Sequence, residues 1–264
     1  MSKEKYILIT AAHNEQDFIE RTILSVIIQL YKPVELIIVS DGSTDNTESI
    51  VNKYVSENSF IKLLTNNRKE GRDFASNVYA INIGLKNIQT SEYDHIGILD
   101  TDVSFDKDYY PLLIEEFKKN PKLGIAGWNY FDTFDGKKIP VYPSPYSVRD
   151  ATQLFWRECF DQIDSLLLMK YDAEDAAACF SPRMYGWETK SFIDLVVLHH
   201  RLTGSAGINL LIARLRDSYL EYNLGYHPLF QFIKCIKRVT QNPYLNGSFL
   251  RLIGYWSARF TFGN

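Results

Sequence analysis

Cysteine and long apolar runs are both scarce in this chain. The three cysteines, Cys159, Cys179 and Cys235, lie far apart and form no C-x-x-C pair, which excludes a disulfide framework and a zinc knuckle. The apolar runs are much shorter than the ~20 residues that a helix needs to cross a bilayer. The first residues lack the pattern of a signal peptide. We therefore expect a cytoplasmic chain.

Excess positive charge and glycine-rich nucleotide loops are missing as well. The formal net charge is −3 over 264 residues, so the chain has no broad basic field with which to bind nucleic acid. It contains neither the G-x-G-x-x-G loop of dinucleotide-binding folds nor the G-x-x-x-x-G-K-[ST] loop of P-loop enzymes. We expect no nucleic-acid partner and neither of these two cofactor-binding loops.

The composition is that of a globular protein, with 45% hydrophobic and 23% charged residues. Over residues 5–105, short β-branched runs alternate with amphipathic segments, which predicts parallel strands joined by helices. The predicted strands are Tyr6–Thr10, Val34–Ser40, Ile61–Thr65 and His95–Leu99. The predicted helices are Glu15–Leu30, Asp45–Glu57 and Arg72–Asn87.

The pattern is less regular after Phe105, where several prolines interrupt it. We predict helices over 106–118, 150–163 and 173–184, strands and loops over 124–145, a strand over Ile193–Leu198, and two or three helices from Asn209 onward. No repeat or obvious linker divides the chain. We therefore expect a single domain over residues 1–264.

Polar motifs follow three of the predicted strands. Thr10–Glu15 comes after the first strand, Ser40–Thr47 after the second, and Asp100-Thr101-Asp102 after the fourth. In open α/β sheets, ligands bind outside the carboxyl ends of the strands. The three motifs therefore predict a binding site at that edge of the sheet.

Each motif taken alone also fits a structural role. Asn14 could cap the first helix. Asp45 with Glu48 three residues later could form a capping box, in which case Asp41 remains for contact with a nucleobase or ribose. Asp100 and Asp102 share one face of an extended segment and can converge on a hard cation such as Mg²⁺ or Mn²⁺. Two acids after a strand are nevertheless also common in plain turns.

The order and spacing of these motifs resemble the inverting family 2 glycosyltransferases. The resemblance covers Thr10–Glu15, Asp41–Thr47, Gly71-Arg72 with Asn82–Leu85, Asp100–Asp102 and Phe155–Phe160. It continues in Glu174-Asp175, which precedes Gly186-Trp187 by the distance at which that family places its E-D pair before a G-[YW] turn. The resemblance implies an α/β fold of GT-A type, with a Rossmann-like, mostly parallel sheet flanked by helices.

The resemblance also implies a role for each matching residue. The nucleotide-sugar-binding residues would be Ala11, Glu15, Asp41, Arg72 and Asp100, for a UDP- or GDP-type donor. Asp102 would bind the metal that holds the diphosphate, and Asp175 would be the catalytic base. Residues 1–105 would form the nucleotide-sugar-binding half of the domain, and residues 106–264 the acceptor-binding half.

The segment Val196–Gly204 carries two histidines and an arginine to a glycine turn. Adjacent residues of a strand point to opposite faces, so only one of His199 and His200 can join a given site. By the resemblance, His199 would be a third metal ligand or a diphosphate contact. Arg201, by its chemistry, is a candidate phosphate partner. Both residues also fit an ordinary loop role.

Some features depart from the family pattern or have a plainer interpretation. Ser40 stands where the family often has a first Asp, and Asp164-Ser165 stands where related chains often have Gly-Gly. Asp175 also fits a solvated helical acid. The C-terminal stretch, Tyr219–Phe262, mixes aromatic and basic residues that could dock peripherally on the inner face of a membrane, although such helices are more often core and solvated face.

The sequence thus predicts a hexosyltransferase that depends on Mn²⁺ or Mg²⁺. It would move a sugar from a nucleoside diphosphate to a hydroxyl of a glycan or lipid-linked acceptor, with inversion, in the synthesis of cell-surface polysaccharide or glycolipid. The alternatives are a nucleotidyltransferase that makes a sugar nucleotide, disfavoured because Thr10–Glu15 lacks a Gly-rich loop, and a non-catalytic sugar-nucleotide or glycan-binding subunit.

Overall fold

The computed structural model describes residues 4–67, 76–134, 137–140, 148, 151–163, 174–201, 210–240 and 244–262. The described residues belong to two compact units. Unit 1 comprises Met1–Leu167 and Ala178–Thr203, and unit 2 comprises Leu168–Ala177 and Gly204–Asn264. No helix among the described residues is both long enough and apolar enough to span a bilayer.

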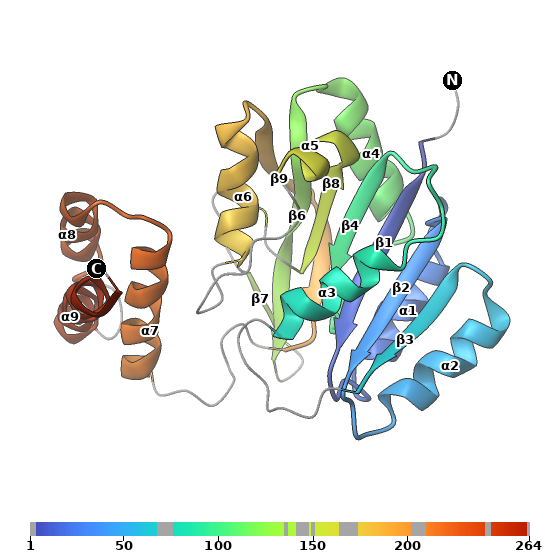
Figure 1. Cartoon of the computed structure of the whole chain (residues 1–264), viewed down its shortest axis with the longest axis horizontal. Coiled ribbons are helices and arrows are strands. Elements are labelled where there is room, and N and C mark those ends of the chain that lie inside the picture. The colour runs from blue at the N-terminus through green and yellow to red at the C-terminus, as the bar shows by residue number, and fades with distance from the viewer. Residues whose placement is uncertain are drawn as a thin grey trace. The chain divides into compact units, whose positions relative to one another are not determined.

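A single mixed sheet lies at the centre of unit 1 (Figure 1). Its strands are β1 (Tyr6–Ala12), β2 (Glu35–Asp41), β3 (Ile61–Asn66), β4 (His95–Leu99), β5 (Val103–Phe105), β6 (Leu123–Phe134), β7 (Lys137–Pro140), β8 (Thr152–Trp156) and β9 (Glu188–His199). The order is β3-β2-β1-β4-β8-β6-β9-β5, and β7 pairs with β6. Strands β3, β2, β1, β4, β6 and β9 run in one direction, and β8, β5 and β7 run against them.

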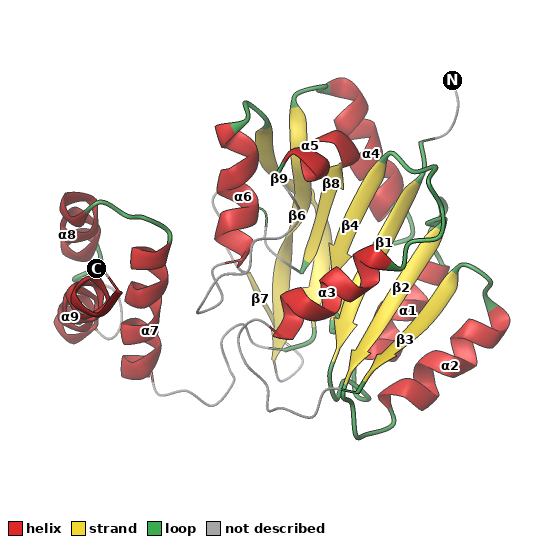
Figure 2. Ribbon diagram, in the orientation of Figure 1, coloured by secondary structure: helices red, strands yellow, loops and turns green. Residues whose placement is uncertain are grey.

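Helices cover both faces of the sheet (Figure 2). Those of unit 1 are α1 (Ile19–Ile27), α2 (Thr47–Glu57), α3 (Ser76–Lys86), α4 (Tyr109–Lys119), α5 (Arg157–Gln162) and α6 (Glu174–Met184), whose first residues fall in unit 2. Unit 2 contains α7 (Leu210–Asn223), α8 (Pro228–Lys237) and α9 (Tyr244–Phe262).

The two faces have separate cores because side chains along a strand alternate between faces. Tyr6 and Leu8 of β1 pack with residues of α1, α2 and α4 in one buried cluster. Ile7 and Ile9 of the same strand pack with residues of α3, α5 and α6 in the other. Strands β1 and β2 are buried on both faces, which explains their continuous apolar runs.

The structure confirms the predicted alternation of strands and helices up to Phe105 and the strand around Ile193–Leu198. The first helix begins later than predicted, at Ile19, and the N-terminal part of the predicted helix Arg72–Asn87 lies outside the described residues. The helix predicted over 150–163 was wrong in its first half. Residues Thr152–Trp156 form β8, which pairs antiparallel with β4 and buries Leu154 and Phe155 on opposite faces.

Candidate functional site

The carboxyl ends of β1, β2 and β4 meet at one edge of the sheet. β1 pairs in parallel with both β2 and β4, so the segments that follow these strands emerge side by side. They are the three polar motifs of the sequence. Among their acidic side chains, those of Glu15, Asp41 and Asp102 are buried, with exposed fractions of 7%, 7% and 5%. Buried carboxylates need charged or hydrogen-bonding partners, and each of the three has them.

The first two motifs are tied together by hydrogen bonds. Asn14, in the left-handed region at φ 55°, accepts through Oδ1 from the amide of Thr44 at 2.8 Å. The amide of Glu15 donates to Oγ1 of Thr47 at 2.7 Å. His13 Nδ1 lies 2.7 Å from the carbonyl oxygen of Asp41. The loop after β1 and the loop after β2 therefore form one joined wall.

This geometry corrects one predicted capping role and half of another. α1 begins at Ile19 without a side-chain cap, and Asn14 instead holds the loop after β2. Asp45 Oδ1 accepts from the amide of Thr47, the first residue of α2, at 2.9 Å. Glu48, however, does not complete a capping box and instead accepts from Ser40 Oγ at 2.7 Å. These side chains stabilise loop–loop and strand–helix contacts across the site, which local sequence spacing does not predict.

Asp41 has a partner that the sequence analysis missed. Asn66, the last residue of β3, lies beside Asp41 in the parallel register and donates from Nδ2 to Oδ1 at 2.7 Å. One carboxylate oxygen of Asp41 is thereby oriented by the neighbouring strand. The signal was present in the sequence, since Asn66 is a polar residue at the carboxyl end of a predicted parallel strand.

Three potential metal ligands, two carboxylates and one imidazole, come together at the turn after β4. One ligand atom each from Asp100, Asp102 and His199 lies within 4.8 Å of the others. His199 reaches this position because β5, which directly follows the turn, pairs antiparallel with β9 and places Val103 opposite His199. Thr22 of α1 fixes the same turn by donating to the carbonyl oxygens of Thr101 and Val103.

The two histidines point to different surroundings, as neighbours on a strand must. His199 Nε2 lies 3.3 Å from Asp102 Oδ2. His200 Nε2 lies 2.9 Å from Ser104 Oγ, and its Nδ1 lies 3.3 Å from Arg21. Burial and the charge of Arg21 lower the pKa of His200. The structure therefore places the imidazole of His199, and not that of His200, beside the Asp102 carboxylate.

Arg201 bridges the first and third motifs. Its Nε donates to Asp102 Oδ2 at 2.5 Å, and its Nη2 pairs with Glu15 Oε2. Its guanidinium also lies 5.0 Å from the centre of the Phe18 ring, a contact that the sequence analysis missed. Aromatic residues near the start of a helix are too common for Phe18 to have been identified from sequence.

These contacts set the charge state of the site. Burial alone would raise the pKa of Asp102, but the hydrogen bonds and charges of His199 and Arg201 hold that pKa below its usual value. Burial raises the pKa of Glu15, although Arg201 opposes the shift. Asp102 is thus an ionised carboxylate beside an imidazole. This donor set, two carboxylates and one imidazole nitrogen, suits a divalent cation.

The described part of the structure does not include every predicted site residue. Ala11 lies at the end of β1, half-buried, next to the joined loops. Arg72 and Asp164-Ser165 lie outside the described residues. Asp175 belongs to the first turn of α6, and its side chain also lies outside the described part. The glycine turn after that helix is present, with Gly186 at φ 88°.

The described geometry can be compared with known proteins. A family model described as glycosyl transferase family 2 matches residues 7–190, which include all three motifs. The chain belongs to this family. The acidic turn and the joined loops are therefore parts of a glycosyltransferase domain.

Curated relatives of this glycosyltransferase match it over a shorter stretch. The poly-beta-1,6-N-acetyl-D-glucosamine synthase of Staphylococcus aureus is 36% identical over 126 residues, which is 48% of this chain and 28% of that protein. The synthase of the same name from Staphylococcus epidermidis is 35% identical over 121 residues, or 45% of this chain and 27% of that protein. The matching stretch thus covers less than a third of the length of these relatives.

Solved structures support the fold over nearly the whole chain. The mannosyltransferase PcManGT from Pyrobaculum calidifontis, in complex with GDP-Man and Mn²⁺, aligns with a TM-score of 0.64 at 16% identity and covers 99% of this chain and 76% of that one. TarS 1-349 of S. aureus, in complex with UDP-GlcNAc, aligns with a TM-score of 0.60 at 15% identity and covers 98% and 73%. The α/β fold of GT-A type is therefore confirmed.

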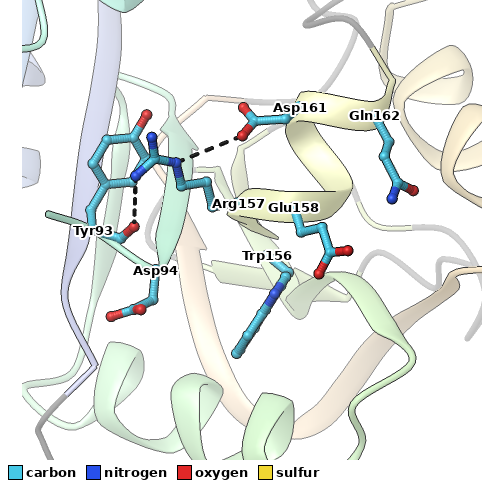
Figure 3. A pocket seen from close by; sticks show the side chains of 7 residues that line it. All are labelled: Tyr93, Asp94, Trp156, Arg157, Glu158, Asp161 and Gln162. Atoms are coloured by element: carbon cyan, nitrogen blue, oxygen red, sulfur yellow. Dashed lines mark hydrogen bonds and ion pairs between the residues drawn. The ribbon is translucent and has the colours of Figure 1, made fainter. Parts of the chain in front are cut away.

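This glycosyltransferase has a pocket of about 440 Å³, whose lining side chains are shown in Figure 3. It is lined by Tyr93, Asp94, Trp156, Arg157, Glu158, Asp161 and Gln162, at the amino end of β4, whereas Asp100 follows the carboxyl end. Arg157 packs 4.3 Å from the Tyr93 ring centre and lies 3.7 Å from Asp161. With its cation so engaged and acids around it, this pocket is unsuited to a diphosphate.

Proposed function

We propose that the chain transfers a sugar from a nucleoside diphosphate donor to a hydroxyl group of an acceptor, with inversion at the anomeric carbon and with a divalent cation. The observation that carries the proposal is the grouping of Asp100, Asp102 and His199 beside the joined loops after β1 and β2. This grouping lies where open α/β sheets bind their ligands. Two solved structures of similar fold support it, one in complex with GDP-Man and Mn²⁺ and the other in complex with UDP-GlcNAc.

The donor would lie along the carboxyl edge of the sheet. Asp41, with one oxygen already held by Asn66, would accept from the base or ribose, and Ala11 would leave room beside it. Asp100 would contact the ribose side of the diphosphate. Asp102 and His199 would hold Mn²⁺ or Mg²⁺, which when bound offsets the negative charge on the departing diphosphate. UDP-GlcNAc is the donor we would test first, because the relatives with the higher identity are N-acetylglucosamine polymer synthases.

The chemistry then needs one more carboxylate. In an inverting transfer, a base takes the proton of the acceptor hydroxyl while that oxygen forms a bond to the anomeric carbon. The bond from that carbon to the diphosphate oxygen breaks, and the nucleoside diphosphate leaves from the opposite face. Asp175 is our candidate for the base, and Arg72 is a candidate contact for the nucleotide.

The acceptor would be a glycan or a lipid-linked sugar, in the synthesis of cell-surface polysaccharide or glycolipid. The names of the curated relatives support the polysaccharide class. Peripheral contact of the C-terminal helices with the inner face of a membrane would bring the enzyme to an acceptor carried by a lipid.

The test uses purified full-length chain with UDP-GlcNAc or GDP-Man, with and without Mn²⁺ or Mg²⁺. We expect metal-dependent release of nucleoside diphosphate from at least one donor. Asp175→Asn should lower transfer by about 10²–10⁴-fold while calorimetry still detects nucleotide binding. Glu57→Gln, which changes an exposed acid of α2, is the control and should keep its activity. Full activity of Asp175→Asn would remove Asp175 from the mechanism, and nucleotide binding without any transfer by the unmodified chain would favour a binding subunit.

A further inference from the structure

Helix α8 is amphipathic, but its apolar face points outward. Leu229, Phe232 and Ile236, spaced three and four residues apart, have exposed fractions of 62%, 51% and 57%. Gln231 and Cys235, on the opposite side, have exposed fractions of 0% and 2%. In a helix that packs on a core in water, the apolar stripe is the buried one. The orientation of α8 is the reverse.

Helix α9 shows the same reversal over its whole length. Its exposed large apolar residues recur at intervals of four, four, three and four, which places them on one stripe: Leu245, Phe249, Ile253, Trp256 and Phe260. The residues on the inner side are small or polar apart from one tyrosine: Ser248, Arg251, Gly254, Tyr255 and Ala258. Two neighbouring helices therefore present apolar stripes outward and polar groups inward.

Polar contacts hold the interior of unit 2 together. Glu221 of α7, with an exposed fraction of 4%, accepts from Arg251 of α9 at 2.9 Å. Lys234 and Arg238 lie 2.8 and 3.4 Å from the same carboxylate oxygen, and Gln231 of α8 donates to the other one. Because the Glu221 carboxylate is satisfied by donors from α8 and α9, the three helices can pack with the apolar residues left outside.

An exterior of this kind calls for an apolar environment. Large apolar side chains in contiguous exposed patches mark surfaces that contact a partner or a membrane. Phe249, Trp256 and Phe260 are aromatic, as are Phe230 and Phe232 of α8, and aromatic residues favour the membrane–water interface. Neither α8 nor α9 is both long enough and apolar enough to span a bilayer, so these helices would lie along the membrane surface.

The charge of this region identifies the kind of surface. After Glu221 the sequence contains no Asp or Glu, whereas it contains the cations Lys234, Lys237, Arg238, Arg251 and Arg259. Lys237 and Arg259 are exposed on the same two helices as the apolar stripes. An anionic lipid surface complements this charge. A second copy of the same face would bring like charges together, which opposes self-association.

We propose that the outward stripes of α8 and α9, with Lys237 and Arg259, form a docking surface for the headgroup region of an anionic bilayer. The aromatic and aliphatic side chains enter the acyl boundary, and the two cations contact lipid phosphates. This surface does not depend on the reaction proposed above, because it uses no residue of the acidic turn.

The test is flotation of the full-length chain with vesicles of phosphatidylcholine, with or without phosphatidylglycerol. We expect binding to the anionic vesicles. Phe249→Ser with Phe260→Ser, and separately Leu229→Ser with Ile236→Ser, should each weaken partitioning by at least about tenfold. The matched control is Ile28→Ser with Leu30→Ser, because these two residues of unit 1 are as exposed, at 55% and 65%. This control should bind as the unmodified chain does.

Two further readouts separate lipid docking from other occupants. Lipids brominated in the acyl chain should quench the fluorescence of Trp256, and Trp256→Phe should lose that quenching. Lys237→Glu with Arg259→Glu should remove the preference for anionic vesicles. Failure of the unmodified chain to float with anionic vesicles would overturn the proposal. So would a dimer in light scattering that Phe249→Ser with Phe260→Ser makes monomeric while vesicle binding is absent. Circular dichroism and thermal unfolding check that each variant remains folded.

Discussion

Arg201 can bind either the carboxylates of the site or a phosphate group of the donor. It is paired with Asp102 and Glu15, so it neutralises carboxylates at the place where we propose that a cation and a diphosphate bind. A guanidinium can transfer its hydrogen bonds from a carboxylate to a phosphate, because both offer paired oxygens at similar spacing. Arg201 would then weaken the binding of a cation in the absence of nucleotide. It would strengthen the binding of a diphosphate that enters together with the cation.

This competition predicts opposite effects of Arg201→Gln on two ligands. Binding of nucleoside diphosphate in the presence of metal should weaken by about 10- to 100-fold, the usual loss for a hydrogen bond to a charged group. Binding of Mn²⁺ alone should become tighter. Titration calorimetry measures both affinities. Arg21→Gln, which changes an arginine that contacts His200, is the control, and an equal loss of both affinities in Arg201→Gln would contradict the competition.

His95 is a buried residue whose charge state should affect stability. Its exposed fraction is 0%, and its Nε2 lies 2.8 Å from Glu4. Burial lowers the pKa of His95 below its ordinary value, although Glu4 and Asp94 oppose the shift and Lys118 adds to it. Below a pH of about 6.5, the unfolded chain therefore binds a proton that the folded chain does not, and this favours unfolding.

The free energy of unfolding should thus decrease as the pH falls through about 6.5 and level off below the folded pKa of His95. Chemical denaturation over this range measures it. His95→Gln should show a smaller decrease. At a pH of about 8, the imidazole of His95 is neutral in both the folded and the unfolded chain, so the difference in stability between the two proteins there gives the cost of the substitution that is unrelated to protonation. If the stability of His95→Gln falls as steeply as that of the unmodified chain, His95 is not the source of the pH dependence.

At the scale of elements, α3 lies unusually close to the sheet. A Cβ atom added to Gly84 would lie 2.6 Å from Cγ2 of Ile9 and 3.4 Å from Cγ2 of Val39. Both neighbours are fully buried in the core that α3 covers. Glycine at this position therefore sets the distance between the helix and strands β1 and β2, which lead directly into the site.

Gly84→Ala consequently tests packing against helix propensity. Alanine in an exposed helix interior stabilises by up to about 1 kcal/mol relative to glycine, but here the added methyl group should destabilise by about 1–3 kcal/mol through overpacking. Denaturant unfolding followed by circular dichroism measures the change. Lys86→Ala, an exposed change in the same helix, should have little effect. A more stable Gly84→Ala variant would show that α3 can move away from the sheet at no cost.

At the scale of the whole molecule, ligand binding should couple to stability. The acidic turn is joined to α1 through Thr22, to β9 through His199 and to the loop after β1 through Arg201. A cation and a nucleotide bound there would favour the folded state by mass action, by about 2.7 kcal/mol at a ligand concentration 100 times the Kd.

We expect Mn²⁺ with UDP to raise the unfolding temperature more than either ligand alone, and EDTA to reverse the metal-dependent part. Differential scanning fluorimetry measures this shift. Asp102→Asn should lose most of it, whereas Asp106→Asn, an exposed acid just after β5, should retain it. The same shift in Asp102→Asn would place the metal elsewhere.

The sequence by itself determined the alternation of strands and helices in the first hundred residues and the position of the acidic turn. Those features depend on residues a few positions apart, whose periodicity and strand ends can be read along the chain. It also restricted the site to one of two histidines, because strand neighbours face opposite ways. The family resemblance selected His199, and the structure places that residue beside Asp102.

Only the tertiary structure decided which distant residues meet. Arg201 pairs with Glu15 across 186 positions, and Asn66 reaches Asp41 through the register of β2 and β3. The strand β8, predicted as helix, exists because its ladder with β4 satisfies its backbone and buries both of its faces. The local hydrophobic pattern shows which face of a strand is buried, but which distant strands pair depends on the packing of the whole chain.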